Sequence, residues 1–168
     1  IQKAVFRKAE KIDSPKKGLL YRVYTAERAD MENFDDAIIA AEWNEMQSTR
    51  QASDQGIIPT VSLNGTKHPD EYFGMIIQGY IKVSKQGIYT FYTNSDDGSK
   101  LYIGDQEVVD NGGYHGGTIK KGQIALEEGY HPLRINYFQG GGGKDLQAGW
   151  VTADGIEQPL PVFNLFHK

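Results

Sequence analysis

The chain has no cysteine among its 168 residues. Disulfides, thiol catalysis and thiolate metal ligands are therefore excluded. No apolar run approaches the roughly 20 residues of a transmembrane helix, so we expect no membrane span. A basic excess is also lacking, because 18 Lys and Arg stand against 22 Asp and Glu, for a net charge of −4. Domains that bind nucleic acids carry a basic patch or stripe, so we expect no nucleic-acid partner.

What the chain has in abundance is glycine and aromatic residues. It contains 20 Gly, 10 Tyr and 7 Phe. Aromatic residues favour strands, whereas glycine serves tight turns and bulges. The length is that of one domain with room for a core. Composition therefore predicts a single β-rich domain.

Short stretches rich in strand-forming residues alternate with turn signals along most of the chain. Many of them alternate apolar and polar residues, which is the period of a half-buried strand. Short strands at regular spacing predict an all-β sandwich or barrel. The predicted strands are Gly18–Tyr24, Tyr72–Val83, Gly87–Asn94, Lys100–Ile103, Glu107–Val109, Gly117–Leu126, His131–Phe138 and Leu146–Thr152.

Two segments depart from the strand pattern. Ile39, Trp43 and Met46 recur at helical spacing, so we expect at most a short helix near 35–47, with Trp43 as a core anchor. Residues 47–70 are polar and broken by Gly and Pro. Residues 1–17 are predicted to be a linker or approach strand from a preceding domain, and 18–168 the domain itself.

The run Ser95–Ser99, with the sequence SDDGS, sits between two strongly alternating stretches. It places the carboxylates of Asp96 and Asp97 side by side, and like charges at such a distance repel. Backbone N–H donors of the turn, a cation or a polar ligand would each relieve that repulsion. A purely structural turn remains the alternative, because Asp side chains bond local backbone N–H groups.

Two glycine-rich loops are further candidates for ligand contact. The tract 140–143 consists of four glycines and lacks the Lys-Ser/Thr ending of a phosphate-binding loop. It permits close backbone approach to a ligand, with Lys144 and Asp145 at its end, or it is simply a flexible loop. The second loop, 111–117, carries Tyr114 and His115. The four histidines show no metal-ligand spacing.

Ordered motifs from Phe73 to Trp150 resemble the PA-fourteen family, which is named after the amino-terminal region of anthrax protective antigen. The resemblance extends from about Gly18 to about Val162. It implies a barrel-like β-sandwich of mostly antiparallel sheets. Members occur as accessory modules of bacterial glycosidases, including β-N-acetylhexosaminidases, and as ligand-binding domains of fungal adhesins. The motifs include Gly87–Phe91, Ser95–Ile103, Val108–His115, Gly129–Ile135 and Tyr137–Phe138.

The resemblance also implies a calcium site. In the sugar-binding adhesins an aspartate pair, joined by a cis peptide bond, binds calcium together with an asparagine and backbone carbonyls of a second loop. The pair corresponds to Asp96 and Asp97, and the carbonyls to the 140–143 tract, with Gly141 and Gly143 as candidates. Gln139 stands where the adhesins have asparagine. Its longer side chain loses more rotamer freedom when fixed, so we expect weaker calcium binding, or none.

The hypothesis from sequence is a non-catalytic, calcium-dependent carbohydrate-binding module of a larger extracytoplasmic glycan-degrading protein. Asp96, Asp97, Lys144 and Asp145 would contact the glycan, with Tyr114 stacking on a sugar ring beside His115. The alternative is a structural module that packs against the catalytic domain of the same chain and has no ligand of its own. No carboxylate pair has a spacing that recommends glycosidase chemistry, so we expect no enzyme.

Overall fold

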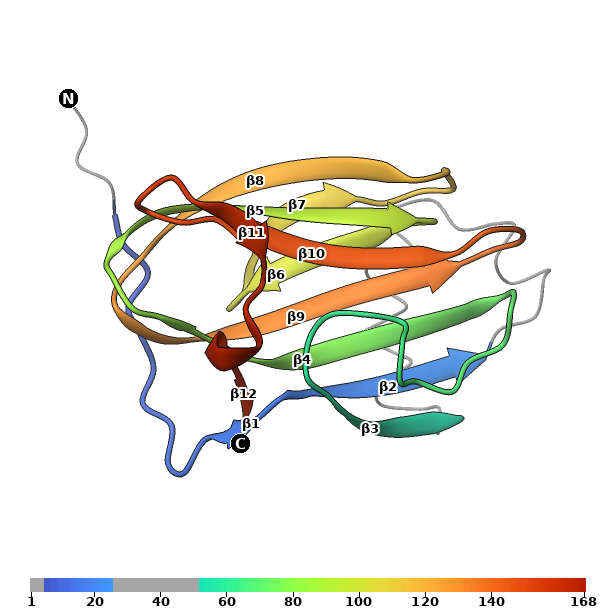
Figure 1. Ribbon diagram of the computed structural model, residues 1–168, viewed down its shortest axis with the longest axis horizontal. Coiled ribbons are helices and arrows are strands. Elements are labelled where there is room, and N and C mark those ends of the chain that lie inside the picture. Colours follow the sequence, from blue (N-terminus) through green and yellow to red (C-terminus); the bar gives the residue numbers. More distant parts are fainter. Residues whose placement is uncertain (1–4, 26–51) are drawn as a thin grey trace.

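Two antiparallel sheets face each other in the computed structural model, which describes residues 5–25 and 52–168 (Figure 1). The larger sheet has the order β1-β12-β4-β9-β6-β7, and β2 pairs with β4 and with the edge strand β3. The smaller sheet has the order β11-β10-β5-β8. The strands are β1 (Lys16–Lys17), β2 (Leu19–Thr25), β3 (Asp54–Ile58), β4 (Phe73–Val83), β5 (Gly87–Asp96), β6 (Ser99–Ile103), β7 (Gln106–Asn111), β8 (Thr118–Leu126), β9 (Gly129–Gln139), β10 (Asp145–Val151), β11 (Glu157–Pro159) and β12 (Leu165–His167), with a 3-10 turn, η1 (Val162–Asn164).

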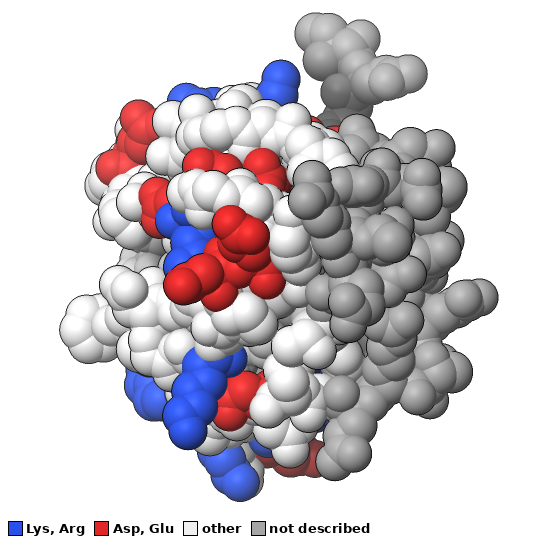
Figure 2. Space-filling view, turned by 90° about the vertical axis from the view of Figure 1, so that its right-hand side faces the viewer, with Lys and Arg blue, Asp and Glu red and all other residues white. Residues whose placement is uncertain are grey.

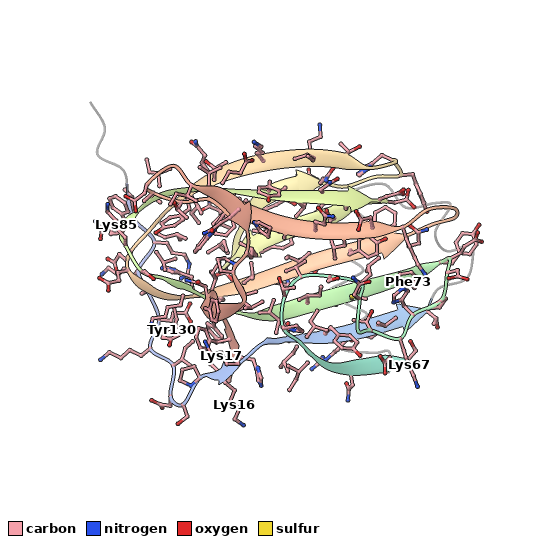
Figure 3. The ribbon with its side chains drawn as sticks, viewed as in Figure 1. Lys16, Lys17, Lys67, Phe73, Lys85 and Tyr130 are labelled. Carbon is pink, nitrogen blue, oxygen red and sulfur yellow. The ribbon has the colours of Figure 1, made fainter. Side chains whose placement is uncertain are left out.

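The core lies between the sheets and follows from the alternation of the strands. In β5 every second residue from Tyr89 to Ser95 is buried, because successive side chains of a strand point to opposite faces. Trp150 of β10 packs against Tyr89 and Phe91, with ring centroids 5.0 and 5.8 Å apart. Phe73, at one end of the sandwich in Figure 3, extends this aromatic core by packing against Tyr137, with ring centroids 5.9 Å apart.

The eight predicted strands are all present, with ends that differ by one or two residues in most cases. The all-β antiparallel sandwich is therefore confirmed. Four short strands were missed, β1, β3, β11 and β12; β3 lies within the polar stretch 47–70. The helix near 35–47 and its Trp43 lie outside the described residues. No helix in the described part of the chain has the length and apolar character that crossing a membrane requires.

The connection from β5 to β6 carries the chain from one sheet to the other. β5 pairs with β8 and β10 in the smaller sheet, whereas β6 pairs with β7 and β9 in the larger one. Only Asp97 and Gly98 lie between the two strands. Asp96 is thus the last residue of a strand, and the two aspartates stand where the sandwich closes at one end (Figure 1).

The described part of the amino-terminal segment is fastened to the sandwich. Arg7 forms a β-bridge with Leu126, and Glu10 forms one with Tyr130. Arg7 Nη1 also lies 2.8 Å from Nδ1 of His131, which is fully buried. His131 Nε2 donates to the Glu127 carbonyl oxygen at 2.8 Å, which leaves Nδ1 as the acceptor for Arg7.

This contact predicts a loss of stability in mild acid. Burial and the Arg7 charge hold the pKa of His131 below its usual value, although the Glu127 carbonyl opposes them. As pH falls below about 6.5, the unfolded chain takes up a proton that the folded chain resists. The free energy of unfolding should fall by up to about 1.4 kcal/mol per pH unit. Urea titrations at several pH values check this. A His131→Gln variant that keeps the wild-type slope would contradict it.

Candidate functional site

Four segments meet at the end of the sandwich to which β5 and β9 run (Figure 1). They are the Asp96–Gly98 crossover, the 112–117 loop between β7 and β8, the 140–144 loop between β9 and β10, and residues 69–72 before β4. We call this the loop end. Acidic side chains gather near the centre of its described surface, next to a basic one (Figure 2). The two glycine-rich loops predicted to contact a ligand are thus brought to the aspartate pair.

Asp97 ties two of these loops together. Its Oδ2 accepts a hydrogen bond from the Gly140 backbone N–H at 2.7 Å, and its Oδ1 accepts one from the His115 N–H at 3.2 Å. Only 7% of the residue is exposed. A buried carboxylate is tolerated where backbone donors satisfy it. Asp97 therefore has a structural role whether or not a ligand binds.

Within residues 5–25 and 52–168, no backbone N–H is seen to donate to the Asp96 carboxylate. Desolvation, and next the charge of Asp97, raise the pKa of its carboxyl, and Asp145 adds to the effect. Asp145 is the cross-strand partner of Asp96. The bond between Asp96 and Asp97 is cis, as in the aspartate pair of the family that the sequence resembles. The Asp96 side chain is thus an electrostatically costly anion that a cation would stabilise.

Tyr137 contacts the backbone of Asp96 from the core side. Its hydroxyl, fully buried in the core, donates to the Asp96 carbonyl oxygen. Burial raises the pKa of this hydroxyl strongly, so it remains a donor. Sequence reasoning missed Tyr137 as a site residue because its alternation on β9 marks it only as core.

Gln139 organises the glycine tract. It is fully buried, and its Nε2 donates to the carbonyl oxygens of Gly142 and Gly143, both at 3.0 Å. Its Oε1 lies 3.4 Å from the Tyr137 hydroxyl. Gly143 is close to the pair, since a Cβ built on it would lie 3.4 Å from Asp96 Oδ2. Gly141 lies instead beside Tyr72 and Glu71.

The donors at the loop end fit a hard cation such as calcium. Calcium takes carboxylate and carbonyl oxygens, and the Asp96 carboxylate and the Gly143 residue lie together here. Within residues 5–25 and 52–168 no cluster of three or more His, Cys, Asp or Glu could hold a metal, so an ion here would depend on carbonyl oxygens. Gln139 Nε2 competes for two of these carbonyls. This competition is a physical reason to expect weaker calcium binding with glutamine than with asparagine at this position.

The position of Gly98 leaves no room for a side chain. Its φ is not among the positive values, so backbone freedom is not the reason for glycine here. A Cβ at this position would lie 2.2 Å from a Phe138 ring carbon and 2.8 Å from the Gly113 carbonyl oxygen. The crossover therefore packs directly on β9 and on the 112–117 loop.

Gly98→Ala should consequently lower the free energy of unfolding by about 1–3 kcal/mol, the usual cost of overpacking. Chemical denaturation measures the change. Gly116→Ala, in the same region but with nothing within 4 Å of the added Cβ, is the matched control and should change stability by less than about 0.5 kcal/mol. Equal losses in both variants would show that the packing argument is wrong.

Tyr114 and His115 differ in their exposure and in their contacts. Tyr114 is 46% exposed, and its ring packs edge-on against Phe138, with centroids 5.2 Å apart, and lies against Gly140. It therefore offers a surface next to the tract. The two His115 ring nitrogens lie 2.8 Å from the carbonyl oxygen of Gly116 in the same loop and 2.9 Å from that of Asn111 at the end of β7. The imidazole thus holds the loop closed.

Lys144 and Asp145 lie at the rim. Lys144 Nζ contacts Asp70 Oδ1 at 3.0 Å and the Pro69 carbonyl oxygen at 3.4 Å. It therefore connects the glycine tract to the segment before β4. Asp145 is exposed, and its Oδ1 accepts from the Leu146 N–H at 2.9 Å.

A buried polar cluster beneath the crossover was also missed. Asn111, 1% exposed, donates to the Thr118 carbonyl oxygen at 2.8 Å and reaches Thr93 and Ser95 at 3.3 Å. Ser99 joins the same cluster. Small polar residues alternating on a strand are the signal that could have revealed it. The cluster links the strands that enter and leave the aspartate pair.

The family of the chain follows from its sequence. The family model of the PA14 domain, which is the PA-fourteen family, matches residues 15–162. The chain belongs to the PA14 domain family. Protective antigen of Bacillus anthracis is 27% identical over 113 residues, which is 64% of this chain but 14% of that protein. This PA14 domain thus spans only a small part of the length of its curated relative.

Solved structures share the fold at low sequence identity. The PA14 domain of the MpAFP antifreeze protein has a TM-score of 0.75 at 17% identity, covering 96% of each chain. A PA14 sugar-binding domain from an RTX adhesin has a TM-score of 0.74 at 18% identity, covering 91% of this chain and 99% of its own. Epithelial adhesin 6 of Candida glabrata, in complex with Galβ1-3GlcNAc, has a TM-score of 0.68 at 15% identity, covering 94% and 89%.

Proposed function

We propose that this PA14 domain is a non-catalytic carbohydrate-binding module whose loop end binds a glycan through calcium. The observation that carries the proposal is the Asp96–Asp97 pair, placed next to the glycine tract at the loop end of the sandwich. Sugar-binding domains of adhesins with this fold support carbohydrate as the ligand class. We further propose that the module belongs to a larger extracytoplasmic glycan-degrading protein.

The proposed residue roles follow from their contacts. Asp96 would supply the carboxylate that is not already committed to the backbone, while Asp97 keeps the loops together and offers its remaining lone pairs. Carbonyls of the tract, Gly143 first, and the Gln139 amide would complete the set, with Gly141 more remote. Calcium bound there would attract the vicinal hydroxyls of a sugar.

The rim would set specificity. Tyr114 is 46% exposed, and an aromatic ring suits the apolar side of a pyranose. Lys144, Asp145 and the His115 loop would provide polar contacts around it. Because a single shallow site orders and desolvates few groups, we expect weak binding of each glycan.

A glycan array probed with the fluorescently labelled domain tests this proposal. We expect signals with calcium that disappear with a chelator and in the Asp96→Asn variant, because Asp96 has the carboxylate most in need of a cation. Lys85→Gln, at a surface ion pair with Asp154 elsewhere on the fold, is the control and should bind as the wild type does. Array signals that ignore both the chelator and Asp96→Asn would refute the calcium-bridged site.

A second candidate function rests on an apolar surface away from the loop end. Near the start of β2, a pocket of about 390 Å³ is lined by Ile57, Pro59, Val162 and Phe163. Phe163 is 77% exposed and Ile57 59%. The ammonium of Lys17, which Figure 3 labels, lies 5.9 Å from the centre of the Phe163 ring. Contiguous exposed apolar residues mark interaction surfaces. Docking on a catalytic domain of the same parent chain is the structural-module alternative.

The two candidates are separable. If the apolar surface docks a catalytic domain, Phe163→Ser in the parent protein should lower the activity or thermal stability of that domain, while glycan binding by the isolated module stays unchanged. Ile156→Ser, which changes another exposed apolar residue, is the control. Unchanged parent activity and stability in Phe163→Ser would count against docking.

A further inference from the structure

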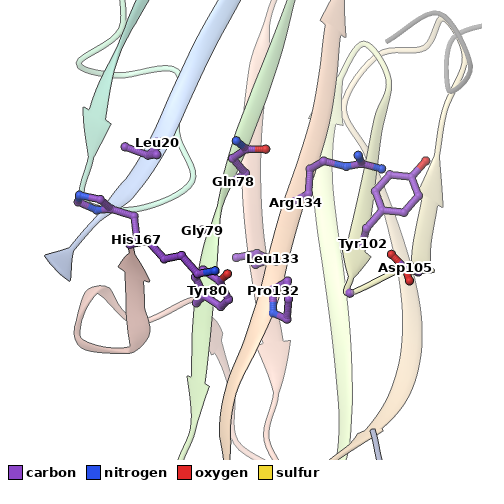
Figure 4. A pocket seen from close by; sticks show the side chains of 12 residues that line it. Leu20, Gln78, Gly79, Tyr80, Tyr102, Asp105, Pro132, Leu133, Arg134 and His167 are labelled. Atoms are coloured by element: carbon purple, nitrogen blue, oxygen red, sulfur yellow. The ribbon is translucent and has the colours of Figure 1, made fainter. Parts of the chain in front are cut away.

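A groove crosses the outer face of the larger sheet, on the side away from the core (Figure 4). It encloses about 730 Å³. Its floor is a row of direct cross-strand partners, one from each neighbouring strand: Leu20 pairs with Gln78, Gln78 with Arg134, and Arg134 with Tyr102. Strands lie about 4.8 Å apart, so this row extends over about 14 Å. The groove is therefore long enough for several units of a chain-like ligand.

Two cations are held over aromatic rings in this groove. The Arg134 guanidinium lies 4.5 Å from the centre of the Tyr102 ring, toward which it extends in Figure 4. The Lys168 ammonium lies 5.5 Å from the centre of the Tyr80 ring. Cation–π contacts of this kind fix the position of the charged group. Among the lining residues, Arg134 and Lys168 stand against one carboxylate, that of Asp105. Carboxylates outside the lining also act on the groove, Glu10 and Asp13 on Lys168 and Glu107 and Asp110 on Tyr102.

The remaining lining is polar without charge or weakly apolar. Gln78 offers an amide, and the two tyrosines offer hydroxyl groups, beside Pro132 and Leu20. Amide and hydroxyl groups match the hydroxyls of a sugar, while a guanidinium binds carboxylate in a bidentate manner. An acidic, hydroxyl-rich chain satisfies both kinds of group.

We propose that this groove is a second glycan-binding site, specific for a carboxylated oligosaccharide such as an oligouronate. Arg134 and Lys168 bind carboxylates of successive or nearby units. Gln78 and the tyrosine hydroxyls contact the sugar hydroxyls between them.

The groove is separate from the loop end. Arg134 and Gln139 are five residues apart on β9, about 17 Å along a strand, and neighbouring positions alternate between faces. Arg134 is half-buried on the outer face, whereas Gln139 is buried. The groove needs no metal, so its test is independent of the calcium site.

Calorimetric titration with hexagalacturonate in a chelator-containing buffer tests the proposal. We expect binding that weakens with added salt, because the contacts are ionic, and no binding of a neutral galactose oligomer. Arg134→Gln should weaken the affinity at least tenfold. Asp96→Asn and the surface control Lys85→Gln should both bind as the wild type does.

Each outcome of this titration either supports or overturns the proposal. No heat with wild type, equal binding of the neutral oligomer, or unchanged affinity in Arg134→Gln would overturn the proposal. If Arg134→Gln does not fold, the exposed Lys168 provides the second variant, and Lys168→Gln should weaken binding at least threefold. A loss of hexagalacturonate binding in Asp96→Asn would assign it to the loop end instead. Failure of calcium-dependent glycan binding leaves the groove untouched.

Discussion

Replacement of Asp97 by alanine is expected to lower the free energy of unfolding by about 2–4 kcal/mol. The variant removes the two acceptors that satisfy the Gly140 and His115 N–H groups. A buried donor left without a partner costs about 1–3 kcal/mol, and bonds to a charged acceptor lie at the upper end. Because Asp97 joins both glycine-rich loops to the crossover, we also expect glycan binding to disappear.

Urea denaturation without calcium measures the effect of Asp97→Ala on the fold alone. Asp154→Ala, which breaks an exposed ion pair with Lys85, is the control and should cost less than about 1 kcal/mol. If Asp97→Ala is as stable as this control, Asp97 does not tie the loops and the geometry of the site has been misread.

Asp96→Asn should distinguish the contribution of Asp96 to metal binding from its contribution to the stability of the fold. The folded protein raises the pKa of Asp96, so its ionised form is less favourable in the folded than in the unfolded chain. The resulting destabilisation develops as pH rises above about 3.9, the unfolded pKa. Without calcium, Asp96→Asn should therefore be as stable as wild type at neutral pH, or more stable. With calcium, only the wild type should gain stability.

Thermal unfolding of both proteins, with chelator and with calcium, measures this reversal. At a calcium concentration 100 times the dissociation constant, the wild type should gain about 2.7 kcal/mol. A similar calcium-induced gain in Asp96→Asn would remove Asp96 from the metal site. A large loss of stability in Asp96→Asn without calcium would assign it a structural role like that of Asp97.

The order of the strands along the chain could be read from the sequence, because alternation and turn residues act locally. The strands that were missed are short or lack alternation, as in β3, whose Gly56 and Asp54 make it look like a loop. The change of sheet between β5 and β6 was not predictable, since SDDGS between two strands fits a hairpin as well as a crossover.

For the candidate site, the sequence indicated the aspartate pair and two glycine-rich loops, which the structure brings together, but not the separate contacts of the two aspartates. Asp96 and Asp97 are equivalent as letters, yet only Asp97 accepts the bonds of Gly140 and His115. The sequence predicted weaker calcium binding because the Gln139 side chain is longer than that of asparagine. The structure adds a second reason, since Gln139 Nε2 donates to two carbonyl oxygens that an ion would need. Such roles depend on contacts between segments far apart in the chain.

Titration of calcium into chelator-treated protein by calorimetry tests the central claim most directly. We expect a one-to-one complex with a dissociation constant of about 10⁻⁴–10⁻³ M, the range of extracellular modules, and no binding by Asp96→Asn. Gln139→Asn, which shortens the competing amide, should retain binding. No heat from wild-type protein that is demonstrably folded would contradict the calcium mechanism and leave the docking module as the better account.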